Sequence, residues 1–130
     1  MLLCTITLPR VAAVLMSALI VLAVPTAPAA AQGPVYLVDV DDLPLAPGLV
    51  EDAEGRVAFD KPEGRIVQAL ARGRTNPAGV RAFYAETLPA LGWQPGAERT
   101  WTRGKETLRM NVDTQDGVVV VRFAIAPSTP

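Results

Sequence analysis

The spacing of hydrophobic residues changes at Gly92, and this change constrains the fold more than any other feature of the sequence. Upstream, Asn76 and Pro77 are typical of a helix start, and Gly92 is typical of the residue that ends a helix. Between them, residues that fit the buried face of a helix recur every three or four positions: Val80, Phe83, Tyr84, Thr87, Leu88 and Leu91. The sequence therefore predicts one amphipathic helix over residues 77–91.

Downstream of Gly92 the hydrophobic pattern has a period of two, which is typical of strands with one buried face. Three strands are expected, at 98–103, 106–113 and 118–126. Gly104 and Asp116-Gly117 separate them, and Asp-Gly between alternating segments is a strong hairpin signal. We therefore expect an antiparallel meander, with these side chains facing the helix: Leu108, Met110, Val112, Val119, Val121, Phe123 and Ile125.

Two further strands are expected before the helix. Residues 56–60 and 65–72 flank Lys61-Pro62-Glu63-Gly64, which has proline and glycine where a type I turn prefers them. The second segment also suits a helix, so that alternative stays open. With the strand interpretation the element order is β-β-α-β-β-β. The fold class is then α+β, with one helix packed on an antiparallel sheet in a single domain over 56–130.

Residues 32–55 are rich in proline, glycine, aspartate and small apolar residues, and we expect an extended acidic arm there. Pro44 and Pro47 lie too close together for a helix or a central strand. The net charge is −6 over 32–63 and +4 over 64–130. Because the arm has too many apolar residues for a flexible linker, we expect it to dock, either on its own domain or on a neighbouring copy, and it is the candidate cover for the second face of the sheet.

The first 31 residues have the three parts of a secretory signal peptide. Arg10 is their only charge, residues 11–24 are uncharged and largely apolar, and Ala29-Ala30-Ala31 precedes Gln32. A spanning helix needs about 20 apolar residues, so cleavage between Ala31 and Gln32 is preferred to an uncleaved anchor. We therefore expect a periplasmic or secreted protein with no stable membrane span after cleavage.

The chemistry of the exported chain is limited by what its sequence lacks. The sequence has no histidine, and its one cysteine, Cys4, lies in the predicted signal peptide. Histidine and thiol catalysis, and zinc sites built from those side chains, are thereby excluded. Asp39-Val40-Asp41-Asp42 offers oxygen ligands for calcium, but the remaining ligands of a calcium loop are missing. We expect no metal, no cofactor and no enzyme. An enzyme that uses only carboxylates and arginines is the remote alternative.

Basic and aromatic residues of the last three strands are the candidates for binding: Trp101, Arg103, Arg109 and Arg122. Arg109 and Arg122 are expected on one face of neighbouring strands, where they would attract an anion, a lipid headgroup or an acidic partner. In the alternative interpretation the acidic arm or water neutralises the arginines, and Trp101 packs across strands. The net charge of −2 over 32–130 argues against nucleic acid.

One run of residues resembles a pattern found in a group of known proteins. It comprises Gly64-Arg65-Ile66, Val80, Phe83-Tyr84, Leu88 and Leu91-Gly92-Trp93. The run is similar to small uncharacterised exported proteins of Gram-negative bacteria, in which a helix ending in Leu-Gly-Trp precedes a strand meander. The resemblance covers roughly residues 56–126. It implies the fold and a periplasmic setting, and it carries over no site residue.

These observations favour a non-catalytic periplasmic interaction module that binds a protein or an envelope component. The four candidate residues would provide the surface, and an exposed sheet edge would offer a place for a partner to add a strand. The alternative is a carrier for a small ligand or anion, with a pocket between the helix and the sheet.

Overall fold

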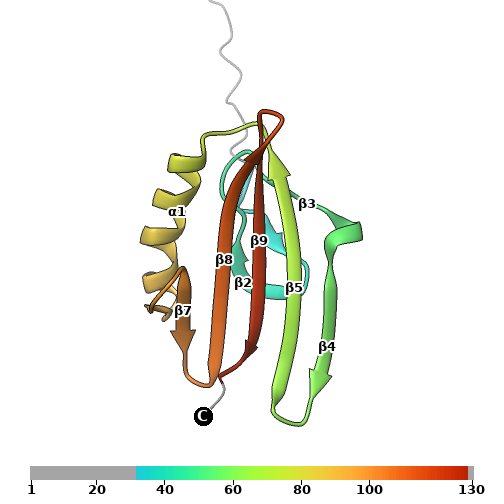
Figure 1. The fold of residues 1–130 in the computed structure, drawn as a ribbon, viewed down its shortest axis with the longest axis vertical. Coiled ribbons are helices and arrows are strands. Elements are labelled where there is room, and N and C mark those ends of the chain that lie inside the picture. Colours follow the sequence, from blue (N-terminus) through green and yellow to red (C-terminus); the bar gives the residue numbers. More distant parts are fainter. Residues whose placement is uncertain (1–31, 129–130) are drawn as a thin grey trace, which may run out of the picture. The chain divides into compact units, whose positions relative to one another are not determined.

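The computed structural model describes residues 32–128 (Figure 1). The predicted signal peptide at 1–31, and with it the cleavage site, lies outside the described residues. In the described part of the chain, one helix packs on an antiparallel sheet, so the predicted fold class is confirmed.

A seven-stranded sheet forms the body of the domain, with the strand order β3-β5-β9-β8-β7-β6 and with β4 also paired to β5. Its strands are β3 (Val50–Glu51), β4 (Val57–Lys61), β5 (Gly64–Gly73), β6 (Gln94–Pro95), β7 (Thr100–Arg103), β8 (Glu106–Gln115) and β9 (Val118–Pro127). The pairings between these strands are antiparallel. The long strands β5, β9 and β8 lie side by side at the centre (Figure 1).

Both predicted hairpins are confirmed. Lys61 pairs with Gly64 across the β4–β5 turn, and β5 is a strand with neighbours on both sides, which settles the helix alternative. Asp116 and Gly117 join β8 to β9 with φ of 52° and 76°. Positive φ at both central residues is the geometry that matches the twist of the flanking strands.

The helix α1 (Pro77–Ala90) begins where the sequence predicts. The Asn76 side chain accepts hydrogen bonds from the N–H groups of Ala78 at 2.8 Å and Gly79 at 3.3 Å. These bonds satisfy donors that have no partner within the first turn. At the other end Gly92 has a φ of 88°, the left-handed conformation that closes a helix. The helix therefore starts and stops through local chemistry.

The connection between α1 and β8 differs from the prediction. A strand was expected from residue 98, but β7 begins at Thr100, because Glu98 and Arg99 have φ of 49° and 62° and form a turn. The short strand β6 was not predicted. It contains Pro95, which an edge strand tolerates because its outer side needs no backbone donor.

The N-terminal segment, residues 32–55, is part of the domain and not an extended arm. It forms β1 (Tyr36–Leu37), β2 (Val40–Pro44), β3 and the short 3-10 helix η1 (Ala53–Gly55). The apolar residues that enter the common core are Leu37, Leu43, Leu45, Ala46 and Leu49. The expectation that this segment docks is thus confirmed, and one core spans the expected boundary between residues 55 and 56.

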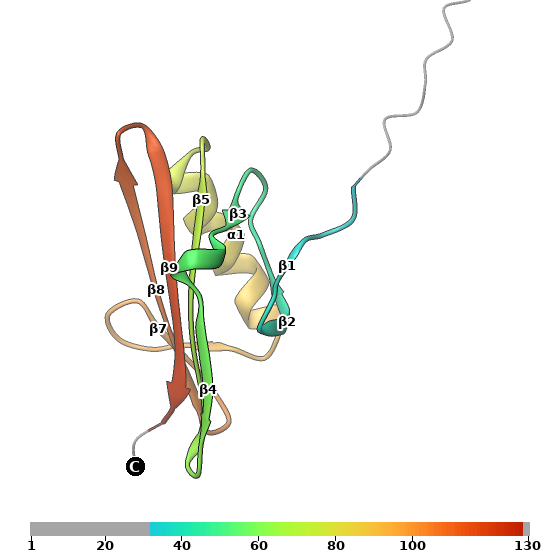
Figure 2. The same ribbon diagram turned by 90° about the vertical axis from the view of Figure 1, so that its right-hand side faces the viewer.

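The expected position of the N-terminal segment was wrong. Strands β1 and β2 lie on the same side of the sheet as α1, and the second face does not receive them (Figure 2). Single helices are about 10 Å wide, which covers roughly two strands at a spacing of about 4.8 Å. Because α1 lies over β8 and β6 and reaches β9 through Tyr84, the apolar side chains of β5 on the same face need another cover. The N-terminal segment provides it.

Candidate functional site

The sheet separates the four predicted binding residues onto two faces. Trp101 lies opposite Leu108 and packs against the core, on the face that α1 and the N-terminal segment cover. Arg103, two residues further along β7, shares that side. Arg109 and Arg122 point to the other face, because their strand neighbours of opposite parity are buried in the core. The structure therefore forms two pairs and no single site.

Arg103 is engaged within the molecule. Its guanidinium lies 4.4 Å from the centre of the Trp93 ring, and it donates a hydrogen bond to the carbonyl oxygen of Leu91 at 3.2 Å. It also forms ion pairs with Asp42 and, at 3.6 Å, with Glu106. A cation stacked on an aromatic face and paired with two carboxylates has few donors left for a partner. For this residue the structure favours the intramolecular alternative.

Trp101 is half-buried against the same core, opposite Leu108 on β8 and Pro95 on β6. Trp93, which follows the helix stop, is almost fully buried, as expected for the residue that packs α1 onto the sheet. The cross-strand packing interpretation of Trp101 thus agrees with its position.

Arg109 and Arg122 lie on the sheet face opposite α1, β1 and β2, where η1 borders the face at Leu70 and Val120 is buried. In register, Arg109 lies opposite Ala124, and Arg122 lies opposite Asn111 on one side and Leu70 on the other. This open face is defined by its exposed or half-buried side chains at the centre: Gln68, Leu70, Arg109, Asn111, Arg122 and Ala124. They line a shallow hollow of about 370 Å³. The prediction that the two arginines share a face of neighbouring strands is confirmed.

The charge of the open face is available to a partner. Arg122 pairs with Asp113 at 3.3 Å, but both side chains are about half exposed. Ion pairs of this kind contribute about 0–1 kcal/mol because water competes for both groups. A carboxylate of a partner can therefore replace Asp113 at little cost.

One border of the open face is the edge strand β4. Val57 and Phe59 lie opposite Gln68 and Ile66 of β5, so their side chains are on the open face. Both are large apolar residues and are 48% and 46% exposed. Neither residue was among the candidates from the sequence, although alternation in Arg56-Val57-Ala58-Phe59-Asp60 placed both on one side of a strand.

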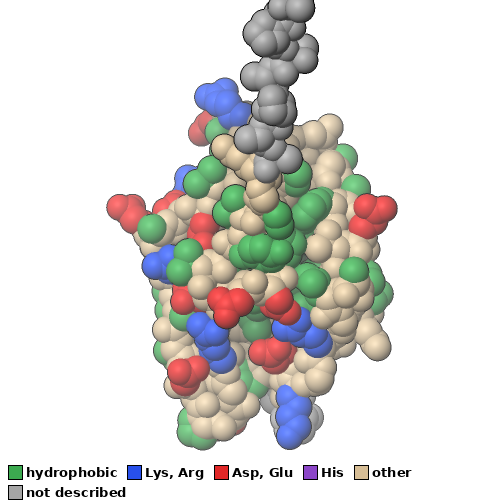
Figure 3. Space-filling model, turned by 180° about the vertical axis from the view of Figure 1, so that it is seen from behind, with side chains coloured by type: hydrophobic (Ala, Val, Ile, Leu, Met, Phe, Trp, Pro, Cys, Tyr) green, Lys and Arg blue, Asp and Glu red, His purple; other side chains and the backbone are tan. Residues whose placement is uncertain are grey.

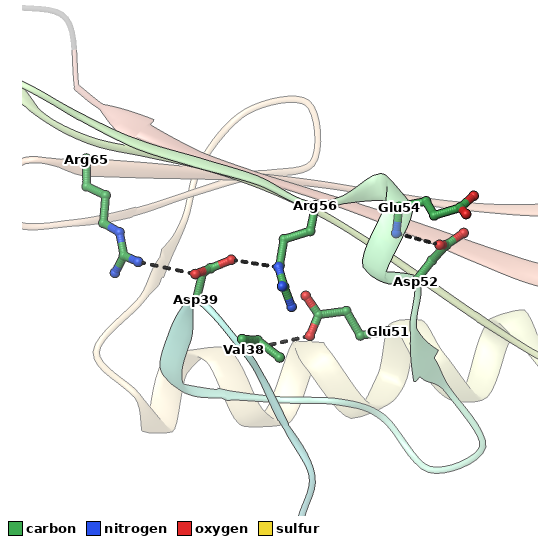
Figure 4. A network of polar contacts seen from close by, with 7 residues as sticks. All are labelled: Val38, Asp39, Glu51, Asp52, Glu54, Arg56 and Arg65. Atoms are coloured by element: carbon green, nitrogen blue, oxygen red, sulfur yellow. Dashed lines mark hydrogen bonds and ion pairs between the residues drawn. The ribbon is translucent and has the colours of Figure 1, made fainter.

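Acidic residues of the N-terminal segment bind basic residues of the sheet on the covered side. Asp39 lies 3.2 Å from Arg56 and 3.7 Å from Arg65, and the Val38 N–H donates to Glu51 at 2.9 Å (Figure 4). A second pair, Asp52 with Arg72 at 3.3 Å, lies instead on the opposite face, because Arg72 alternates with buried Ala71 and points to the same side as Leu70. The predicted neutralisation of a basic body by an acidic segment therefore holds for these pairs and for Arg103.

The surface of that same side has two zones (Figure 3). Hydrophobic side chains gather over the N-terminal segment, where Val35, Tyr36 and Val38 are exposed, and acidic and basic side chains form a band beside them. A hollow of about 300 Å³ in the charged zone is lined by carboxylates and arginines that include Asp39, Asp42 and Arg65. Within residues 32–128, no cluster of three or more acidic side chains has the geometry to hold a metal ion.

The space between α1 and the sheet is filled by side chains. Tyr84 and Leu88 of the helix, Trp93 and Leu108 of β8 are almost completely buried there. Burial raises the pKa of Tyr84 to about 12, against the smaller lowering effect of the hydrogen bond from Ala46. The tyrosine is thus a neutral structural group at physiological pH.

No helix in the described part of the chain is long and apolar enough to cross a membrane. Comparison of the chain with protein-family models, with curated proteins and with solved structures yields no match. Function is therefore inferred from geometry and charge.

Proposed function

We propose that this protein is a non-catalytic interaction module of the periplasm or extracellular space. It binds an acidic protein or envelope component through the open face of its sheet. The observation that supports this most directly is the pair Arg109 and Arg122, which project from neighbouring strands beside a shallow hollow on the sheet face opposite α1, β1 and β2. Single uncovered faces are common in antiparallel sheets, but valine and leucine side chains on them favour a partner.

The proposed compartment rests on the N-terminal sequence. Residues 1–31 combine one basic residue, an apolar run and small residues before Gln32, which is the pattern of an export signal. The periplasm is proposed as the compartment because the pattern over residues 56–126 resembles small exported proteins of Gram-negative bacteria. The proposed absence of catalysis rests on the missing histidine and on a single cysteine within the export signal.

The alternative of a ligand carrier with a pocket between helix and sheet has less support. Tyr84, Leu88 and Trp93 occupy that interface with almost no exposed surface. An anion carrier would instead use Arg109 and Arg122 on the open face, where a small ligand remains in contact with water. Such a shallow position suits a large partner better than a small molecule, since small-molecule sites bury most of the ligand.

Site-specific photo-crosslinking in the cells that export the protein tests the proposal. A photoreactive residue replaces Gln68, which is exposed near the centre of the open face, and in the control it replaces Ala85, which is exposed on α1. We expect one envelope component to be captured repeatedly from position 68 and not from position 85. The double reversal Arg109→Glu and Arg122→Glu should abolish the capture.

The matched control for charge is Arg81→Glu with Arg74→Glu, which reverses two exposed arginines away from the open face. Capture from position 68 should survive this change. Equal capture from both positions, or capture that persists after reversal of Arg109 and Arg122, would contradict the proposal. A melting temperature for each variant shows that loss of capture is not loss of folding.

A further inference from the structure

The outer strand β4 has a free hydrogen-bonding edge. In residues 32–128 it pairs with β5 alone, and all five of its residues are exposed. Natural edge strands are usually blunted by prolines, bulges or charges along their length. In β4 the charges Asp60 and Lys61 stand at one end, while Val57, Ala58 and Phe59 form an apolar centre. Such an edge can accept another strand.

The backbone groups of β4 that face outward follow from the hairpin. The two-residue turn after Lys61 makes Lys61 and Gly64 a hydrogen-bonded pair, and bonded pairs alternate along an antiparallel ladder. The backbone N–H and C=O groups of residues 57, 59 and 61 are therefore directed towards β5. The N–H and C=O groups of Arg56, Ala58 and Asp60 are directed towards the free edge.

We propose that this edge pairs with β4 of a second copy of the chain, antiparallel and centred on Ala58. This register puts Arg56, which is one-third exposed and also pairs with Asp39, opposite the partner's Asp60, and symmetry repeats the pair. It also puts Val57 opposite the partner's Phe59 on the open face. The outward-directed residues 56, 58 and 60 meet each other, as a bonded ladder requires. Opposite charges and apolar pairs therefore match at every position from 56 to 60.

The self-complementary sequence favours a second copy over another occupant. Arg56-Val57-Ala58-Phe59-Asp60 has opposite charges at its two ends and an apolar centre, so it matches itself only when antiparallel. Directly opposite unlike charges and aromatic–β-branched pairs both stabilise antiparallel strands. The pairing would join the two sheets, and because Val57 and Phe59 lie on the open face, it would join the two open faces as well.

The contact is small, so the expected association is weak. Five residues per chain bury far less than the about 1,600 Å² of a standard interface, which places the dissociation constant on the order of micromolar or above. We therefore expect a monomer–dimer equilibrium that shifts with concentration. The inference does not depend on the function proposed above, since a dimer forms in the purified protein without any partner.

Sedimentation velocity of the protein expressed from its full sequence tests the inference. The weight-average mass should rise towards twice the monomer mass with increasing concentration. Ala58→Pro removes an outward N–H and leaves the bonds to β5 in place, because proline is tolerated on the free side of an edge strand. This variant should stay monomeric over the same range. The matched control is Ala58→Ser, which keeps the N–H and should dimerise.

Charge complementation tests the register. Asp60→Lys alone places a lysine opposite the partner's Arg56, and Arg56→Glu alone places a glutamate opposite the partner's Asp60, so each variant should be monomeric. In an equimolar mixture both cross-chain pairs again join opposite charges. One pair links the two substituted side chains, and the other links the native Arg56 and Asp60, so the mixture should dimerise. If Ala58→Pro fails to fold, this experiment still tests whether the dimer forms through β4.

Three outcomes would overturn the inference. They are a monomer at every concentration, a dimer that persists in Ala58→Pro, and a mixture of the two charge variants that stays monomeric although each folds. A monomer whose β4 instead binds an unrelated extended peptide would assign the edge to a foreign strand. Partner capture through position 68 has its own readout, so failure of the dimer and failure of the proposed function are distinguishable.

Discussion

The hydroxyl of Tyr84 donates a hydrogen bond to the carbonyl oxygen of Pro44 at 3.0 Å, and it accepts one from the N–H of Ala46 at 3.1 Å. The tyrosine side chain has no exposed surface. One hydroxyl thereby satisfies two buried backbone groups that have no access to water. The bond joins α1 to the N-terminal segment, and it explains why both can share one face of the sheet.

Tyr84→Phe should lower the free energy of unfolding by about 1–3 kcal/mol, because it leaves the Pro44 carbonyl and the Ala46 N–H buried without a partner. Urea unfolding followed by tryptophan fluorescence measures the change in midpoint. The control is Tyr36→Phe, since the Tyr36 side chain is exposed. An equal effect of the two variants would show that the buried bond contributes nothing.

Alkaline pH should destabilise the protein through the same tyrosine. Burial raises the pKa of Tyr84 to about 12 in the folded state, against about 10 in the unfolded chain. The folded state favours the neutral phenol, so this contribution to stability is complete below a pH of about 10. It is lost as the pH rises towards about 12 and the buried phenol ionises. Between these two pH values, the melting temperature should fall more steeply with pH for the native protein than for Tyr84→Phe. Parallel curves would be inconsistent with a buried neutral phenol.

Leu43→Ala should lower the free energy of unfolding by about 2–5 kcal/mol, although Leu43 belongs to the segment that the sequence predicts to be an arm. Its side chain has no exposed surface and lies in the common core. Val50→Ala, at a side chain that is 72% exposed in the same segment, is the control and should change stability by less than about 0.5 kcal/mol. A small effect at Leu43 would mean that the segment is not part of the core.

Gly73→Ala should disrupt packing at the end of β5. An added Cβ would collide with the carbonyl oxygen of Gly48, and a backbone atom cannot move aside as a flexible side chain can. We expect the free energy of unfolding, measured by thermal denaturation, to fall by about 2 kcal/mol or more. In contrast, Gly79→Ala in α1 meets only ordinary contact with Asn76 and should gain up to about 1 kcal/mol in helix propensity. A neutral Gly73→Ala would exclude the close approach.

Arg103→Lys should destabilise the fold without affecting partner capture. Lysine keeps the charge but loses the planar group that stacks on Trp93 and reaches Asp42, Glu106 and the Leu91 carbonyl, at a cost of about 1 kcal/mol. Chemical denaturation measures the cost, and photo-crosslinking from position 68 measures capture. Arg109→Lys on the open face should leave stability unchanged. Loss of capture in Arg103→Lys would return this residue to the candidate binding surface.

Much of the fold could be predicted because local chemistry specifies it. Asn76, Pro77 and Gly92 set the ends of α1 through capping, and Asp116-Gly117 sets the β8–β9 turn through its positive φ angles. Alternation then placed the inward residues of β8 and β9 correctly, and it placed Arg109 and Arg122 together on the other face. These features depend on residues close to each other in the chain.

Other features could not be predicted because they depend on contacts between distant residues. Alternation shows that Trp101 and Arg103 share one side of a strand, but it does not show that Trp93 lies beneath the guanidinium. The acidic segment contains many possible partners for Arg103, and only folding selects Asp42. The candidate site was therefore half predicted, with Arg109 and Arg122 on an open face and the other two residues used in packing.

The sequence by itself determined the periodicities, the helix ends, the hairpin turns and the absence of histidine chemistry, because each follows from residue type and spacing along the chain. Only the tertiary structure decided which face of the sheet the N-terminal segment covers, and hence which face stays open. The reason is geometric: α1 covers β8 and reaches Phe123 of β9 through Tyr84 but is too narrow to cover β5 as well, and the Tyr84 hydroxyl holds the segment beside the helix. That choice leaves Arg109, Arg122 and the edge of β4 exposed to a partner.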